Sequence, residues 1–220
     1  MQFLVEAFPF LVKGLMVTVQ ITVAAAVLAA VLALVAGLAR LAPTRWLRLP
    51  AAAYVEVFRG TSALVQLFWF YFVLPFFGVQ LSAFAAGVIV LGLNTGAYGS
   101  EVVRGAIQAV PRAQREAAAA LNLTRLQALR RVVLPQALPA MLPPAGNLAI
   151  ELLKNTALVS LITITELTFS AQILRAETLR SAEIFTLVLV LYFAAALVIT
   201  GGVRRLERRA GRGLPQGGVG

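Results

Sequence analysis

The charged side chains that could do chemistry in this chain are few, and several of them form closely spaced pairs. The chain of 220 residues contains no histidine and no cysteine, and its nine acidic residues are all glutamates. Zinc clusters, disulfides, cysteine nucleophiles and Ser-His-Asp triads are therefore excluded. Glu151 lies three residues before Lys154, and Glu56 lies three residues before Arg59. This spacing places the two members of each pair on one face of a helix.

The Glu151 and Lys154 pair stands in very apolar sequence. Hydrophobic residues make up 60% of the chain and charged residues 13%, whereas soluble domains average about half and about a quarter. A charge in the interior of a bilayer costs at least about 2.5 kcal/mol, so an ionisable group that is retained there is a candidate functional group. Glu151 could receive the cationic end of a zwitterion, or it could simply neutralise Lys154.

Other polar residues in apolar surroundings are candidates for the same path. Glu56 and Arg59 could contact a solute, pair with each other or pair with another subunit. Asn94 could line the path or form a hydrogen bond between helices. Glu101 and Arg104 are expected to act mainly as gate or structural charges.

Long uncharged stretches predict about five transmembrane helices. A helix needs roughly 20 apolar residues to cross about 30 Å of hydrocarbon. The predicted spans cover residues 14–39, about 52–75, about 81–100, 132–165 as one bent span, and 184–203. We therefore expect an all-α membrane protein with a transmembrane domain over residues 1–209 and a disordered tail at 210–220.

The basic residues predict how the chain is oriented in the membrane. Arginines are concentrated after the first predicted span, after the third and in the tail, whereas the opposite side has only Lys13, Arg175 and Arg180. Basic residues are enriched in cytoplasmic loops. The amino terminus is therefore predicted to be outside and the carboxyl terminus in the cytoplasm.

The segment at residues 105–135 is too polar to cross the membrane and favours helix. Pro111 suits the start of a short helix and Asn122 its left-handed end. Thr124 and Gln127 form a possible capping box that opens a second helix. A helix, a corner and a second helix could dock another protein, or could lie on anionic lipid as an amphipathic connector.

This segment resembles the EAA loop of ATP-binding cassette (ABC) importer permeases. The pattern of that family is EAA, three residues, G, nine residues, I, one residue, LP. The matching residues are Glu116, Ala117, Ala118, Asn122, Val132, Leu134 and Pro135. The similarity extends over about residues 10–209 and is greatest to the polar amino acid branch, within which the chain looks most like the ectoine and hydroxyectoine permeases.

Two residues depart from the family pattern. Asn122 stands where the family usually has glycine, and asparagine is the residue next most tolerant of a left-handed corner, so the corner is expected to persist. Ser62 stands where relatives often have proline, near the bend expected beside Arg59.

The resemblance implies a permease subunit with the type I ABC importer fold. Such a subunit pairs with a second permease, expected here as a heterodimer, docks two ATPase subunits and receives solute from an extracytoplasmic binding protein. The residues implied to couple to the ATPase are Glu116, Ala117, Ala118, Leu121, Asn122, Leu134 and Pro135. The implied solute is a small zwitterion, either ectoine, hydroxyectoine or a polar amino acid.

The chain is expected to be no enzyme itself. It has no G-x-x-x-x-G-K-[ST] motif for holding nucleotide, so no cofactor is expected on it, and ATP and Mg²⁺ are expected on the partner ATPase. The expected location is the bacterial cytoplasmic (inner) membrane, in contact with lipid and without nucleic acid. The alternative is a self-contained, ion-coupled secondary transporter in which Glu151 and Lys154 relay a proton or an ion.

Overall fold

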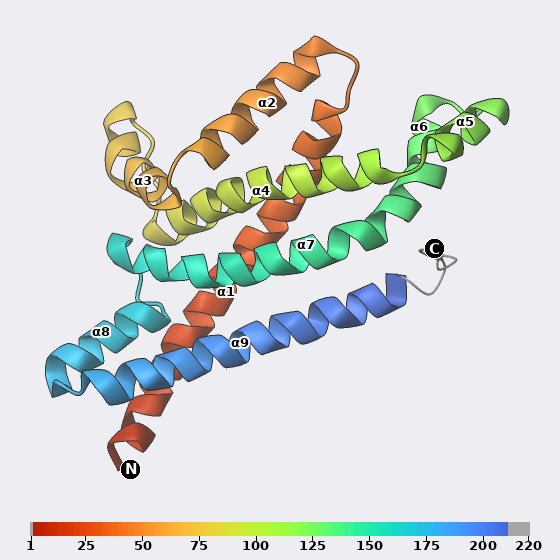
Figure 1. Cartoon of the computed structure of the whole chain (residues 1–220). Coiled ribbons are helices and arrows are strands. Elements are labelled where there is room, and N and C mark those ends of the chain that lie inside the picture. The colour runs from red at the N-terminus through yellow and green to blue at the C-terminus, as the bar shows by residue number, and fades with distance from the viewer. Residues whose placement is uncertain (1, 211–220) are drawn as a thin grey trace.

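The computed structural model of the chain describes residues 2–210, and side chains from residue 7 onwards. Every regular element in this part of the chain is helical (Figure 1). In chain order the elements are α1 (Gln2–Arg40), α2 (Arg45–Gly60), α3 (Ala63–Phe68), the π-helix η1 (Trp69–Val73), the 3-10 helix η2 (Leu74–Phe77), α4 (Ala83–Ala109), α5 (Arg112–Ala120), α6 (Arg125–Ala128), the π-helix η3 (Leu129–Val133), α7 (Leu134–Asn155), the 3-10 helix η4 (Thr156–Ile162), α8 (Leu167–Thr178) and α9 (Ser181–Ala210). Ala210 ends α9, and the rest of the predicted tail lies outside the described residues.

The number of membrane-crossing elements agrees with the prediction. Within residues 2–210, three helices are long and apolar enough to cross a membrane: residues 7–40 of α1, α4 and α9. Two further pairs of helices qualify if each bent pair counts as one span, which brings the total to as many as five.

The second predicted span is not one continuous helix. Helix α2 ends at Gly60, Thr61 and Ser62 are extended, and α3 starts at Ala63. The two arms meet at 105°. The prediction of one continuous helix over 52–75 was therefore wrong, whereas the bend expected beside Arg59 is present, directly after Gly60. Ser62 adopts an extended backbone (φ −69°, ψ 133°).

Side-chain amides satisfy the carbonyl groups that this break releases. The Gln66 Nε2 atom donates to the carbonyl oxygens of Phe58 at 3.0 Å and Thr61 at 3.2 Å. The Asn94 Nδ2 atom of α4 also donates to the Phe58 oxygen, at 2.9 Å. A backbone group without a partner is very costly at membrane depth, so these two amides make the broken helix tolerable there.

The fourth predicted span is longer than expected and ends in a helix that the sequence did not predict. The helical path runs from Arg125 to Ile162, turns at Thr163 in a left-handed conformation (φ 68°) and continues in α8 at 53° to its previous course. Prolines at positions 139, 143 and 144 lie inside α7 without ending it. The prediction of one bent span over 132–165 therefore captured α7 and η4 but missed α8.

Small residues allow α1 to pack closely against α4. Figure 1 shows α1 running obliquely across the other long helices, and α4 is its main neighbour. A Cβ atom at Gly96 of α4 would lie 2.9 Å from the Cβ atom of Leu32, and one at Gly99 would lie 2.8 Å from the Cβ atom of Ala33. Close approach through small residues is a usual way to pack helices in a membrane, where the hydrophobic effect does not hold them together.

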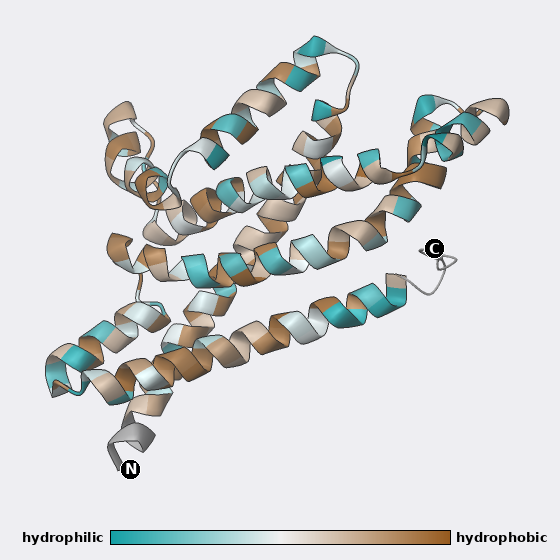
Figure 2. Cartoon of the chain, in the orientation of Figure 1, coloured by the Kyte–Doolittle hydropathy of each residue, from teal (hydrophilic) through white to brown (hydrophobic). Residues whose placement is uncertain are grey.

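Hydrophilic stretches mark one end of the molecule. In Figure 2 they lie there on α5, on α6 and in the last turns of α9; further hydrophilic positions lie on α2, α7 and α8, and the middle of α9 is hydrophobic. The helices α5 and α6 and the end of α9 lie toward the same end in Figure 1. This arrangement is compatible with the predicted orientation, in which these parts share the cytoplasmic side.

Candidate functional site

The segment between α4 and α7 forms the predicted helix, corner and helix. Helix α5 covers Arg112–Ala120, and Asn122 takes up the left-handed conformation (φ 54°) after it. Thr124 and Gln127 form the predicted capping box, with both reciprocal hydrogen bonds present. The corner and the capping box are therefore confirmed.

One face of α5 is turned outward and the other is held by the body. Ala118 is 2% exposed, whereas Glu116, Ala117 and Leu121 are exposed, and Leu121 reaches 74%. Glu116 pairs with Arg112 along the outer surface, with 2.9 Å between its Oε1 atom and Nε. The residues available to a docking protein are thus part of the predicted set, while Ala118 serves the fold.

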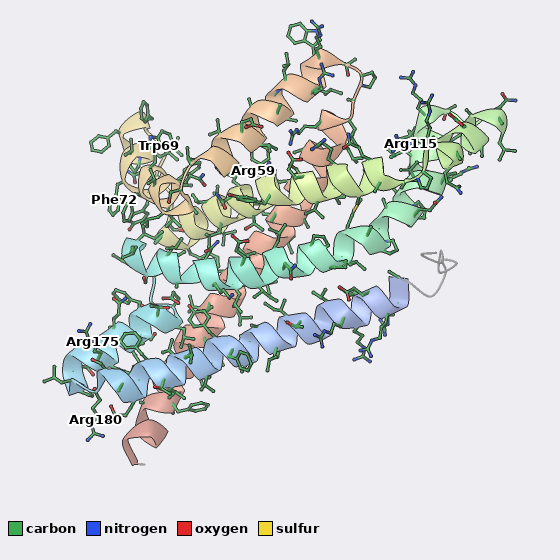
Figure 3. The ribbon with its side chains drawn as sticks, viewed as in Figure 1. Arg59, Trp69, Phe72, Arg115, Arg175 and Arg180 are labelled. Carbon is green, nitrogen blue, oxygen red and sulfur yellow. The ribbon has the colours of Figure 1, made fainter. Side chains whose placement is uncertain are left out.

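Two hydrogen bonds tie α5 to its neighbours. The Arg115 guanidinium, labelled in Figure 3, donates to the carbonyl oxygen of Ile107 near the end of α4. The Gln136 Nε2 atom of α7 donates to Gln114 Oε1 of α5 at 3.3 Å. At the start of α7, Leu134 is half-buried in the adjacent apolar cluster and Pro135 is exposed. A force on α5 would therefore reach both α4 and α7.

Glu151 and Lys154 lie on one helix, α7, as predicted, but they do not form an ion pair. Both side chains are exposed, and the ion pairs of the described residues include neither of them. The alternative in which the two charges simply neutralise each other is therefore not what the structure shows. Charges left exposed on an otherwise apolar helix need water, a solute or another subunit.

Lys154 lines a cavity between α7 and α9. This cavity has a volume of about 740 Å³, and its other lining residues, Tyr192 and Phe193 among them, are almost entirely apolar. A second cavity of about 200 Å³ follows along the same two helices and includes Asn147 and Glu207. The side of α7 that faces α9 thus combines space with polar groups.

Glu56 and Arg59 do not pair with each other either. Glu56 is exposed and has no ion pair in the described part of the chain. Arg59 instead donates through Nη1 to Glu101 Oε1 of α4 at 3.2 Å, and its guanidinium lies 5.2 Å from the centre of the Tyr98 ring. Figure 3 shows Arg59 at the end of α2, next to α4.

Glu101 is the centre of a charge cluster whose full extent the sequence did not predict. Its carboxylate accepts from Arg40 of α1, from Arg59 of α2 and, at 2.7 Å, from Arg104 of its own helix. Only the pair with Arg104 has the local spacing that a sequence can reveal. The cluster joins the ends of α1 and α2 to α4, which fits the structural role expected for Glu101.

Asn94 is used at the helix break. It is 8% exposed, and its Nδ2 atom donates to the Phe58 carbonyl oxygen and, at 3.2 Å, to Gln66 Oε1. The structure therefore gives this residue a definite structural task. A contact with solute, as predicted from the sequence, stays a prediction.

Glu166 is a buried carboxylate that the sequence analysis missed. It caps α8 by accepting from the backbone N–H groups of Thr168 and Phe169, both at 2.9 Å. It also accepts from the hydroxyl groups of Tyr192 at 3.0 Å and Thr18 at 3.3 Å. A lone glutamate in an apolar segment was the available signal, but its partners on α1 and α9 are far away in sequence. The carboxylate fastens α1, α8 and α9 together.

These sites are built from ion pairs and hydrogen bonds between helices. Among residues 2–210, histidine, cysteine, aspartate and glutamate side chains form no group of three that could hold a metal ion. The other features of the site are exposed charges, a cavity lined by Lys154 and the outward face of α5.

Comparison with known proteins places these features in a wider group. A family model described as "Binding-protein-dependent transport system inner membrane component" matches residues 26–212. The chain is 47% identical over 201 residues to the "Probable amino-acid ABC transporter permease protein y4tF" of Sinorhizobium fredii, with 89% of this chain and 84% of that protein covered. It is 39% identical over 205 residues to the "Glutamine transport system permease protein GlnP" of Escherichia coli K12, with 92% and 94% covered.

The fold is also found among solved structures. A structure described as an amino acid ABC transporter with histidines superposes with a TM-score of 0.87 at 36% sequence identity. The match covers 94% of this chain and 97% of that chain.

Proposed function

We propose that this chain, which belongs to the binding-protein-dependent transport system inner membrane component family, carries a small zwitterionic solute through the membrane with energy from a separate ATPase. The chain has the all-helical fold of type I ABC importer permeases. It is thus a permease subunit of a binding-protein-dependent importer of the inner membrane. The match over residues 26–212 carries this conclusion. It includes the segment at residues 105–135, called the docking segment below, and every charged candidate of the path.

The proposed contact with the ATPase is the outward face of α5. Glu116, Ala117 and Leu121 are exposed there, and small side chains let another protein approach closely. The corner at Asn122 and the capping box at Thr124 fix the shape of the segment. Two ATPase subunits, which hold ATP and Mg²⁺, would close together around the bound ATP. Their closure would push on the two permeases and produce a rigid-body change between two states.

The proposed solute is a polar amino acid. The relatives reported above are described as amino-acid permeases, and one of them as a glutamine permease. The exposed carboxylate of Glu151 could accept hydrogen bonds from the ammonium group of such a solute. Hydrogen bonds that involve a charge contribute about 1.5–3 kcal/mol, enough to select a cationic group. Ectoine and hydroxyectoine are the narrower proposal and have the same zwitterionic character.

The proposed partner on the α7 side is a second permease, most simply a different chain. Glu151 and Lys154 are both exposed on α7, Lys154 lines the cavity between α7 and α9, and facing lipid would be costly for both charges. A second permease on this side would enclose the path between the two subunits. A binding protein on the outer side would then deliver the solute.

The test is the ATPase activity of the complete complex in nanodiscs. The complex is assembled with its binding protein, and polar amino acids, ectoine and hydroxyectoine are added in turn. We expect one or more polar amino acids to stimulate hydrolysis, and the Glu151→Gln variant to reduce this stimulation about tenfold or more, since about 1.4 kcal/mol corresponds to a factor of ten. The matched control is Glu177→Gln, because Glu177 is an exposed glutamate of α8.

The outcomes separate the parts of the proposal. Stimulation by ectoines alone would replace the amino acid by the narrower solute class. Equal stimulation of the Glu151→Gln and Glu177→Gln complexes would remove Glu151 from the path. A chain that does not associate with any ATPase would contradict the importer mechanism.

A further inference from the structure

Helix α4 has three residues on one face that contact the end of α2. Asn94, Tyr98 and Glu101 are spaced by four and three residues, so they lie along one face of the helix. Each contacts the last turn of α2. Asn94 binds the Phe58 carbonyl oxygen, and Tyr98 and Glu101 both contact the Arg59 guanidinium.

A further contact one turn earlier strengthens this attachment. The Tyr54 hydroxyl group of α2 donates to the carbonyl oxygen of Leu93 in α4 at 2.6 Å. The last part of α2 is therefore held along about two turns of α4, by two hydrogen bonds, an ion pair and a cation–π contact. Contacts of these different kinds fix both the position of α2 along the axis of α4 and its rotation against α4.

The other end of α4 leads directly to α5. Helix α4 ends at Ala109, α5 begins at Arg112, and Arg115 holds the carbonyl oxygen of Ile107. Glu101 lies about two turns before the end of α4. Because a helix is stiff over this distance, a displacement applied at α5 reaches Glu101 with little loss.

The extended residues Thr61 and Ser62 directly follow the end of α2. We propose that Glu101 and Arg59 are a positioning pair that carries the movement of α4 to the break at residues 61–62, so that the end of α2 and the docking segment move as one body. The inference rests on the proposed function, because the movement is supplied by an ATPase on α5. Arg59 thereby acts through α4 rather than on the solute.

Arg104 provides a matched control within the same cluster. Both Arg59 and Arg104 pair with the Glu101 carboxylate, at 3.2 Å and 2.7 Å. Arg104 belongs to α4 itself, so its pair joins no second helix, whereas the pair with Arg59 joins α2 to α4. Neutralising either arginine removes the same charge from the same carboxylate, but only the loss of Arg59 removes an ion pair between the two helices.

The first experiment measures solute taken up per ATP hydrolysed by the complete complex in liposomes. We expect Arg59→Gln to lower this ratio at least fivefold, Arg59→Lys to lower it less, and Arg104→Gln to keep it within twofold of the original complex. A role of Arg59 in solute binding would instead change the order of preference among solutes. An unchanged ratio in Arg59→Gln, or an equal loss in Arg104→Gln, would overturn the proposal.

The second experiment tests whether α2 and α4 keep their distance, and its main comparison uses a chain in which Arg59 is intact. The chain contains no cysteine, so cysteines introduced for spin labels are the only ones on it. Labels at Val57 of α2 and Gly105 of α4, both exposed, report the distance between the two helices. We expect the same distance distribution in the nucleotide-free and the ATP-trapped complex, and a broader one in Arg59→Gln.

A shift of the α2 to α4 distance between the two states of the original complex would overturn the inference while leaving the proposed function intact. The two failures are distinguishable, because an original complex without ATP-driven uptake would contradict the proposed function instead.

Discussion

Replacing Gly96 by alanine tests the close packing of α1 on α4. A Cβ atom at this position would lie 2.9 Å from the Cβ atom of Leu32, 3.0 Å from the Tyr54 hydroxyl oxygen and 3.2 Å from the carbonyl oxygen of Ala29. Neither the carbonyl oxygen nor a Cβ atom can rotate away. The helices must therefore separate, and the Tyr54 side chain must shift away from its hydrogen bond to Leu93.

The expected loss follows from these contacts. Overfilling a packed site costs about 1–3 kcal/mol, and a lost hydrogen bond costs about 0.5–1.5 kcal/mol. Alanine gains up to about 1 kcal/mol over glycine in helix propensity. With the full propensity gain subtracted, the net expectation for Gly96→Ala is a loss of about 0.5–3.5 kcal/mol.

The assay measures the thermal midpoint of the purified complex in detergent. The midpoint is the temperature at which half of the tagged chain no longer elutes as complex. Gly105→Ala is the matched control, since Gly105 lies on the same helix and a Cβ atom there meets nothing within 4 Å. We expect Gly96→Ala to lower the midpoint and Gly105→Ala to keep or raise it. Equal midpoints for the two variants would refute the packing argument.

Three further changes test other parts of the fold. Glu166→Gln places an amide N–H₂ group against hydrogen-bond donors and should cost about 1.5–3 kcal/mol in the same heating assay. Its thermal midpoint should lie below that of Glu177→Gln, an exposed site on the same helix, and equal midpoints would speak against a structural carboxylate. Asn122→Gly should keep the left-handed corner, whereas Asn122→Val should cost about 1–2 kcal/mol and reduce the amount of ATPase that co-purifies. Equal amounts of ATPase recovered with the two variants would contradict a fixed corner. Gln66→Leu leaves the carbonyl groups at the α2 break short of a donor and should lower the thermal midpoint by more than Val65→Leu, an exposed site beside it. Similar midpoints for the two variants would show that another group donates to these carbonyl oxygens.

Features with a local signal could be predicted from the sequence. The uncharged runs gave α1, α4 and α9, because the length of apolar sequence needed to cross a bilayer is a property of one segment. The corner at Asn122 and the capping box at Thr124 were also predicted correctly, since both depend on residues within a few positions. The same holds for Glu151 and Lys154 on one helix.

Features built from distant residues could not be predicted. Arg40 and Glu101 are 61 positions apart, Arg59 and Glu101 are 42 apart, and Thr18 and Glu166 are 148 apart. No spacing rule connects such residues before the helices are packed. The bend beside Arg59 was expected, but the amides that stabilise it could not be predicted, because they come from Gln66 and from Asn94 on another helix.

The most direct test of the account compares two energy sources for solute uptake. Liposomes hold the complex of this chain with its second permease and ATPase, and uptake of labelled polar amino acids from a loaded binding protein is measured. One sample has ATP and Mg²⁺ available to the ATPase, and the other has a proton or sodium gradient without ATP. The account predicts uptake with ATP and none with the ion gradient alone. Gradient-driven uptake without ATP, by this complex or by liposomes that contain only this chain, would contradict it.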